Sequence, residues 1–156
     1  MFDERLINTA RLLLDDAQQK RLKIVTAESC TGGLLAGLLT EVAGSSKTVE
    51  RGFVVYSNKA KQEMLGVPGE LLADVGAVSE PVARAMAYGA LLNTTAGLSV
   101  AVTGIAGPGG GSAEKPVGLV YLAAGRRKNS IIRIRREVFA GDRTDVRRAT
   151  ILTALD

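Results

Sequence analysis

The feature that most constrains the fold is a short apolar run, residues 22–26, which leads directly into the stretch 27–33, Ala-Glu-Ser-Cys-Thr-Gly-Gly. The run is typical of a buried strand, and the glycines that follow indicate a turn into a helix. Ser29 is therefore predicted to lie where a strand ends and a helix begins. N–H groups at a helix start lack partners within the helix, so they can hold a phosphate or stabilise an oxyanion. The stretch is not the G-x-S-x-G motif, because Ala27 and Thr31 replace its glycines.

The rest of the chain alternates helical and strand patterns. The predicted helices span 3–20, 32–42, 58–65, 79–92 and a last segment, capped by Asp142 or Thr144, that runs to residue 155. The predicted strands span 22–26, 52–57, 98–102 and the hairpin 117–124 with 130–139. This order predicts an α/β fold: a three-layer α/β/α sandwich with a mixed, mostly parallel central sheet and a C-terminal antiparallel hairpin. Without a repeat or linker, residues 1–156 are expected to form one domain.

Three loops follow the predicted central strands, at 28–33, 56–61 and 104–112. In a sheet of this kind, ligands bind beyond the carboxyl ends of the strands. We therefore expect these three loops to meet and to form the functional site.

Composition excludes several classes of protein. No apolar run reaches the roughly 18–20 residues that a membrane span needs, and acidic residues near the N-terminus argue against a signal peptide. A single cysteine excludes an intrachain disulfide and a cysteine zinc cluster. These features favour the cytoplasm.

The chain contains no histidine. This absence excludes a Ser-His-Asp triad, a Cys-His dyad and histidine-based metal sites. If Ser29 is a nucleophile, its base must be Lys, Tyr, Asp or Glu.

Positive charge is concentrated near the C-terminus. Residues 126–148 hold nine basic and three acidic side chains, within a net charge of +4 for the whole chain. This excess is consistent with an anionic ligand or a nucleic acid, but a solvated strand face is the preferred explanation for most of these arginines.

Lys61 follows Tyr56 by about one helical turn, so its side chain could point back toward the strand end. A lysine acts as a base only when it is neutral, and burial lowers its pKa from about 10.4. A neutral Lys61 could take the Ser29 proton directly or through the Tyr56 phenol. From spacing alone, an exposed lysine on a short helix is the favoured alternative. Lys59 has the same chemistry but projects differently.

The loop that begins at Thr103 contains five glycines between Gly104 and Gly111. Such a loop lets backbone N–H groups approach an anion closely. It matches neither the dinucleotide-binding motif nor the Walker A motif. A flexible connection is the alternative, although its place directly after a buried strand favours ligand contact.

Three further residues have two explanations each. Glu28 is a candidate acid or base, but bonds to backbone N–H groups of a neighbouring loop are favoured. Cys30 is a candidate nucleophile, but a small buried residue is the better interpretation. Arg143 starts the last predicted helix, where it could reach a phosphate or form a surface ion pair.

Four motifs together resemble a known family. They are Ala-Glu-Ser-Cys-Thr-Gly-Gly at 27–33, Tyr-Ser-Asn-x-x-Lys at 56–61, Thr-Gly-Ile-Ala-Gly-Pro at 103–108 and Lys-Pro-Val-Gly at 115–118. In this order they resemble the C-terminal domain of CinA, the nicotinamide-nucleotide amidase or NMN deamidase family, in its stand-alone bacterial form. The resemblance covers almost the whole chain.

The resemblance implies hydrolysis of the carboxamide of nicotinamide mononucleotide to nicotinic acid mononucleotide and ammonia, in pyridine nucleotide salvage. It implies Ser29 as nucleophile, Lys61 as base and Tyr56 as an assisting group, with no metal and no organic cofactor. Substrate contacts are expected from Thr31, Gly32, Thr103, Gly104, Gly107 and Arg143. We expect N–H groups of the helix start at Gly32 to stabilise the oxyanion.

Two other functions compete with the amidase. The first is a non-catalytic nucleotide or sugar-phosphate binder that uses the same glycine loops. The second, ranked last, is a nucleic-acid-binding module on residues 126–148, because aromatic residues form only 4% of the chain. The expected partners are a nucleotide substrate and further copies of the chain in a homo-oligomer, with no nucleic acid and no membrane.

Overall fold

The computed structural model describes residues 2–156, which form a five-stranded sheet in the order β2-β1-β3-β4-β5. The strands are β1 (Ile24–Glu28), β2 (Val49–Val54), β3 (Leu98–Gly104), β4 (Leu119–Arg126) and β5 (Ile131–Val138). β1 pairs in parallel with β2 and β3, whereas β4 runs antiparallel to both β3 and β5. The predicted α/β class with a mixed sheet and a C-terminal hairpin is confirmed.

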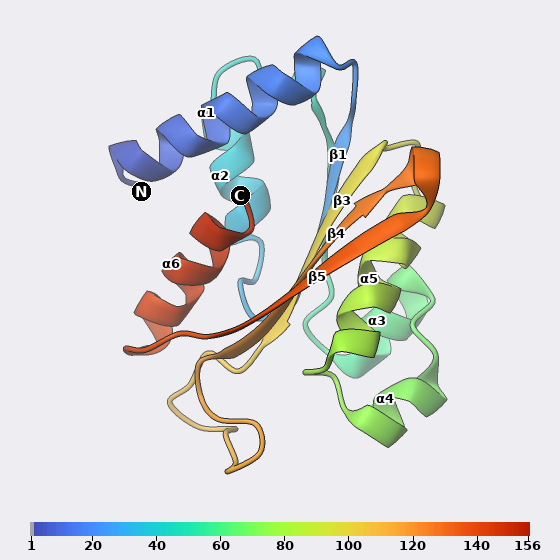
Figure 1. The fold of residues 1–156 in the computed structure, drawn as a ribbon, viewed down its shortest axis with the longest axis vertical. Helices are drawn as coiled ribbons and strands as arrows, with labels where there is room; N and C mark the ends of the chain where they lie inside the picture. Colours follow the sequence, from blue (N-terminus) through green and yellow to red (C-terminus); the bar gives the residue numbers. More distant parts are fainter. Residues whose placement is uncertain (1) are drawn as a thin grey trace.

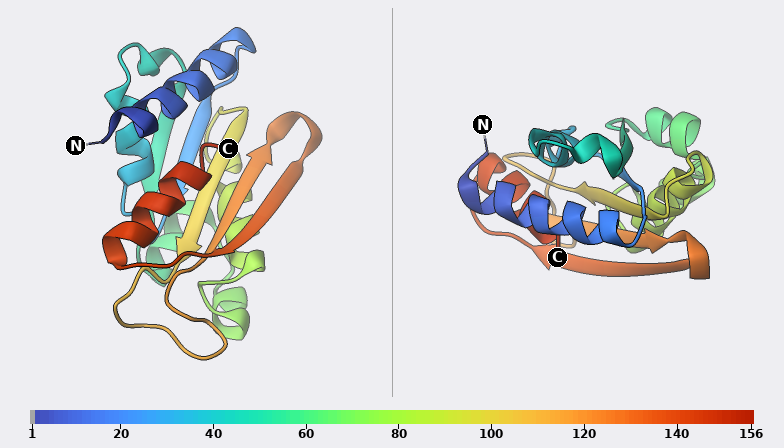
Figure 2. Two further views of the ribbon diagram at one scale, coloured as in Figure 1. Left: turned by 60° about the vertical axis from the view of Figure 1, so that its left-hand side comes forward. Right: turned by 90° about the horizontal axis from the view of Figure 1, so that it is seen from above.

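Helices cover both faces of this sheet, which gives the three layers seen in Figures 1 and 2. One face carries α1 (Glu4–Gln19), α2 (Leu34–Glu41) and α6 (Arg143–Thr153); the other carries α3 (Asn58–Leu65), α4 (Gly69–Val75) and α5 (Glu80–Leu92). Short 3₁₀ turns occupy Ser45–Lys47 and Arg127–Asn129. None of the helices within residues 2–156 combines the length and the apolar character that crossing a bilayer demands.

A separate apolar core fills each side of the sheet. Val25, Ala27 and Ala101 pack against Met86 and Ala87 of α5 on one side. On the other side, α1 and α2 bury a set of leucines and alanines against Ile24 and the end of α6, namely Leu6, Ala10, Leu14, Ala17, Leu35, Leu38 and Leu39. β1 lies between the two helical layers, so all five of its residues are buried, including the polar Thr26 and the charged Glu28.

The ends of several elements differ from the prediction: β1 spans 24–28 rather than 22–26, β3 continues to 104 and β4 spans 119–126 rather than 117–124. β2 spans 49–54 rather than 52–57, because β1 ends at Glu28, opposite Val54, and offers no residue for further pairing. α2 begins at Leu34 rather than at residue 32, because Gly32 and Gly33 adopt positive φ angles of 60° and 96°. The two glycines therefore belong to the turn that carries Ser29.

The helix α4 was not predicted from the sequence. Gly66 caps α3 in the left-handed conformation, which agrees with the predicted helix end at residue 65. Pro68 is the N-cap residue of α4, so one short segment both ends a helix and starts the next. The last helix begins as expected, with Asp142 as its cap, where Asp142 and Asp145 form a reciprocal capping box.

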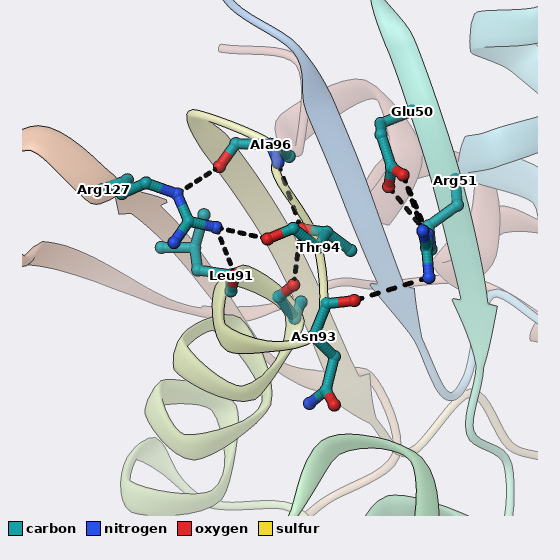
Figure 3. A network of polar contacts seen from close by, with 8 residues as sticks. Glu50, Arg51, Leu91, Asn93, Thr94, Ala96 and Arg127 are labelled. Carbon is teal, nitrogen blue, oxygen red and sulfur yellow. Dashed lines mark hydrogen bonds and ion pairs between the residues drawn. The ribbon is translucent and has the colours of Figure 1, made fainter.

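Two arginines hold the C-terminal end of α5 and the loop after it (Figure 3). Arg127 donates to the carbonyl of Leu91, to that of Thr94 at 2.7 Å and to that of Ala96 at 2.8 Å. Arg51 bonds to Glu50 and donates to the carbonyl of Asn93 at 3.4 Å. Positive charge here satisfies carbonyls that a helix end leaves free. Arg127 therefore has a structural role, although it is exposed and belongs to the basic segment 126–148.

Replacing Arg127 with alanine is expected to lower the free energy of unfolding by about 1–3 kcal/mol, because three carbonyls each lose a charged donor. Urea unfolding followed by circular dichroism measures this change. Arg126→Ala is the matched control: Arg126 is exposed, and no side-chain hydrogen bond to it occurs within residues 2–156. Equal unfolding midpoints for the two variants would contradict the role given to Arg127.

Candidate active site

A cavity of about 280 Å³ lies at the carboxyl ends of β1, β2 and β3. The loops that follow these strands meet there, as expected for a sheet of this type. Its lining comes from the turn after β1, the start of α3 and the segment before it, the end of β3 and the loop after it, the loop before α5, and α6: Ser29, Cys30, Tyr56, Asn58, Lys61, Ala77, Val78, Thr103, Gly104, Ile105, Ala106, Gly107, Gly109, Gly110 and Arg143.

The structure brings Ser29 and Lys61 into direct contact. Lys61 Nζ lies 3.0 Å from Ser29 Oγ, although 32 positions separate the two residues in the chain. The Lys61 side chain is only 1% exposed and Ser29 is 8% exposed. The interpretation that spacing favoured, an exposed lysine, is wrong, because the first turn of α3 points this side chain back beneath the end of β2.

The Lys61 amine has three neighbours in hydrogen-bond range. Besides Ser29 Oγ, they are the carbonyl oxygens of Val55 at 2.9 Å and Tyr56 at 3.2 Å. The two carbonyls can only accept, so they take two of the amine hydrogens. The third position faces Ser29: an ammonium group donates a proton there, whereas a neutral amine offers its lone pair to the hydroxyl.

Burial favours the neutral amine. Loss of solvent around Nζ lowers the pKa of Lys61 below its ordinary value. Within residues 2–156, no carboxylate lies at ion-pair distance from Lys61 to restore the charged form. The arrangement can therefore accept the proton of an attacking hydroxyl.

The side chain of Glu28 caps the N-terminus of α2. Its buried carboxylate accepts from the backbone N–H groups of Gly33 at 3.1 Å, Leu35 at 2.9 Å and Ala36 at 2.8 Å. The expected preference of Glu28 for backbone N–H groups holds, but these groups belong to the turn and helix that follow it rather than to a neighbouring loop.

The prediction that this helix start receives an oxyanion is wrong, because its N–H groups already have acceptors. Those of Gly32 and Leu34 donate to the carbonyls of Ser29 and Thr31. In the part of the chain that the structure describes, the N–H groups of Cys30 and Ala106 have no such acceptor, and both residues line the cavity.

Tyr56 and Arg143 lie together at the mouth of the cavity. Arg143 donates to the Tyr56 phenol oxygen at 3.3 Å and to the carbonyl of Gly107 at 2.9 Å. The Tyr56 phenol thus contacts Arg143, and it is the Tyr56 backbone carbonyl that contacts Lys61. Arg143 bridges the loops after β2 and β3, where its unused donors can meet an anion.

The other predicted substrate contacts divide into two groups. Thr103, Gly104 and Gly107 line the cavity, and the Thr103 hydroxyl donates to the carbonyl of Ala77 at 2.8 Å. Thr31 and Gly32 do not line it. The Thr31 hydroxyl donates to Glu28 at 2.7 Å, and Thr31 is fully buried. These two residues shape the turn rather than the cavity wall.

Sequence reasoning missed several residues of the lining. Asn58 belongs to the motif that contains Lys61, so the motif could have indicated it. Ala77 and Val78 carry no chemical signal, and only the packing of the loop before α5 brings them to the cavity.

Cys30 is a small buried residue, as the favoured interpretation had it. It is 6% exposed, and burial raises the pKa of its thiol to about 11, so the thiol is neutral near pH 7. Within residues 2–156, no three His, Cys, Asp or Glu side chains gather as a metal site would require.

Comparisons with known proteins show similar chains. A protein of Escherichia coli K12 named nicotinamide-nucleotide amidohydrolase PncC is 48% identical over 155 residues, which cover 99% of this chain and 93% of that protein. A putative competence-damage inducible protein of Caldicellulosiruptor bescii is 49% identical over 138 residues, 88% of this chain, but the match spans only 33% of that relative's length.

The fold also matches solved structures. The crystal structure of competence/damage inducible protein CihA from Agrobacterium tumefaciens has a TM-score of 0.96 at 52% identity, and the match covers 99% of this chain and 94% of that chain. The family described as CinA C-terminal domain matches residues 7–156. The resemblance seen in the four motifs is confirmed, and this chain belongs to the CinA C-terminal domain family.

Proposed function

We propose that this chain is a nicotinamide-nucleotide amidase that hydrolyses the carboxamide of nicotinamide mononucleotide to nicotinic acid mononucleotide and ammonia. The observation that carries the proposal is the buried contact of 3.0 Å between Lys61 Nζ and Ser29 Oγ at the cavity. The relative named nicotinamide-nucleotide amidohydrolase supports the choice of substrate.

The proposed reaction has two stages. Ser29 Oγ attacks the amide carbon while neutral Lys61 takes the hydroxyl proton. Lys61 then returns this proton to the leaving nitrogen, which departs as ammonia and leaves an acyl ester on Ser29. Water, deprotonated by Lys61, releases the acid and restores the serine.

We assign oxyanion stabilisation to two backbone N–H groups for which the described residues 2–156 provide no carbonyl acceptor. The Cys30 N–H directly follows the nucleophile, and the Ala106 N–H lies in the loop after β3. Each such donor contributes roughly 3–4 kcal/mol in better-studied hydrolases. Arg143 of α6 and the glycines of the loop after β3 form the proposed phosphate contact, since a guanidinium group pairs well with phosphate oxygens.

The proposal extends to the setting of the enzyme. We infer one amidase domain over residues 1–156, a cytoplasmic location and a homo-oligomer, with the nucleotide as the small-molecule partner. The lone cysteine supports a reducing compartment. The outer edge of β5, which no other described strand covers, supports contact with a second copy.

The direct test is ammonia release from nicotinamide mononucleotide by the purified chain, with and without a chelator. We expect ammonia and nicotinic acid mononucleotide in equal amounts, unaffected by the chelator. Tight binding of the nucleotide without ammonia would instead support the non-catalytic nucleotide-binding function.

The rate is expected to rise with pH. Lys61 must be neutral to accept the Ser29 proton, so kcat/KM increases as pH rises through the pKa of Lys61. Burial lowers this pKa, which places the increase below the value of about 10.4 for a free lysine. Initial rates between about pH 5 and pH 10 measure the profile. A rate that falls over this whole range would contradict a lysine base.

A further inference from the structure

The carboxylate of Glu28 gathers five hydrogen-bond donors around a fully buried position. Besides the three backbone N–H groups at the start of α2, the hydroxyls of Thr31 at 2.7 Å and Thr26 at 3.3 Å point toward it. Both carboxylate oxygens serve as acceptors, which is the hydrogen-bonding role of the ionised group. In the described residues no arginine or lysine forms an ion pair with Glu28, so the donors and the positive end of α2 hold its charge.

This side chain spans the turn that carries the nucleophile. The main chain of Glu28 is held in the sheet, where its carbonyl accepts from the N–H of Val55 at 2.8 Å. Its side chain reaches forward past Ser29 and Cys30 and holds residues from Thr31 onward. The two residues between are therefore fixed at both ends.

Two backbone bonds then set the direction of the Ser29 side chain. The Ser29 N–H donates to the carbonyl of Val102 at 3.0 Å, and its own carbonyl accepts from the Gly32 N–H at 3.1 Å. From outside the turn, Arg147 donates to the Thr31 carbonyl at 3.0 Å. The bond from Gly32 to Ser29 and the contact of Arg147 with Thr31 both depend on the backbone conformation of residues 31–33. Glu28 stabilises that conformation through its bonds to Thr31 and Gly33.

We propose that Glu28 is a positioning residue of the amidase: its charge holds the turn so that Ser29 Oγ faces Lys61, and it occupies the α2 donors so that the oxyanion binds at the Cys30 side. The role of Glu28 in amide hydrolysis rests on the proposed function. Its effect on the reactivity of Ser29, through the turn that carries this serine, is testable without the natural substrate.

Glu28→Gln is the informative change because it keeps the shape and removes the charge. Its amide has one acceptor oxygen, so whichever way it turns, at least one of the N–H groups of Gly33, Leu35 and Ala36 faces an NH₂ group. We expect kcat to fall roughly tenfold or more, since a small displacement of a reacting group is costly, while KM changes much less. The pH midpoint of the rate should stay near that of the wild type, because Lys61 stays buried and keeps its contacts with the carbonyls of Val55 and Tyr56.

Thr31→Val provides a second variant if the first fails to fold. It removes a single donor at 2.7 Å and keeps the buried shape. A positioning role predicts a smaller fall in kcat in the same direction, whereas contact between Thr31 and the substrate would raise KM. Arg127→Ala is the control for lost stability, since Arg127 lies far from the cavity lining and should keep the wild-type kcat.

The substrate-independent measurement is the rate at which a fluorophosphonate probe labels Ser29, followed by mass spectrometry. In this step Lys61 takes the hydroxyl proton of Ser29, the Oγ–P bond forms and the P–F bond breaks, so that fluoride leaves. We expect labelling of the wild type and Arg127→Ala at equal rates, slower labelling of Thr31→Val and the slowest of Glu28→Gln. Equal rates in all four chains, or no labelling of wild-type Ser29, would overturn the proposal. Labelled wild type that releases no ammonia would contradict the amidase and leave the positioning role standing.

Discussion

Replacing Ser29 with alanine is expected to abolish ammonia release from nicotinamide mononucleotide, with kcat falling by about 10³-fold or more. The change deletes the oxygen that lies 3.0 Å from Lys61 and leaves the backbone bonds of the turn in place. The fold should therefore persist, and nucleotide binding should survive because the loop glycines and Arg143 remain. Ammonia release under steady-state conditions and calorimetric binding of the nucleotide measure the two effects separately.

Cys30→Ala is the matched control for this variant. It removes the neighbouring candidate nucleophile and keeps the backbone N–H to which oxyanion binding is assigned. Since the Cys30 thiol is buried and its pKa is raised to about 11, most of the activity should remain. A fully active Ser29→Ala protein, or an inactive Cys30→Ala protein with a native fold, would reject serine catalysis.

The second large effect is expected for Lys61→Met, which should reduce kcat by about 10²–10⁴-fold. Methionine has a similar length and tolerates an apolar site, so the change removes the base without opening a large gap. The carbonyls of Val55 and Tyr56 lose a donor, and thermal unfolding should show whether this alters stability. The rate that remains should no longer rise with pH through the range set by Lys61.

Lys59→Met is the control on the same helix. Its side chain is 81% exposed and pairs with Glu63 at 3.5 Å on the surface, so its removal should leave the rate within about twofold of the wild type. Equal loss of activity in the two lysine variants would show that the effect comes from α3 as a whole and not from the buried amine.

The α/β class and the meeting of three loops at one sheet edge were predictable from the sequence. Apolar runs of strand length alternating with helical patterns determine which residues must be buried, and a parallel arrangement places the strand ends together. The limits of these predictions appear at element ends. Whether β2 continues past Val54 depends on where β1 stops, which its own residues do not reveal.

Residue types alone also decided much of the chemistry. Without histidine, a base for Ser29 had to be a lysine, tyrosine or carboxylate, whatever the fold. The choice of Lys61 came from the family resemblance, because its spacing favoured an exposed position. In the structure Lys61 is only 1% exposed, because the turn at Ser29 and the residues after β2 surround its Nζ.

The sequence by itself therefore determined the layered fold, the loops that form the cavity and the absence of any histidine mechanism, because these follow from local patterns and from the residues present. Only the tertiary structure decided that Glu28 takes the donors of α2, that the Tyr56 phenol meets Arg143, and that the Lys61 amine is desolvated beside Ser29. The physical reason is that hydrogen bonds and desolvation depend on distances between groups far apart along the chain, and packing alone sets those distances.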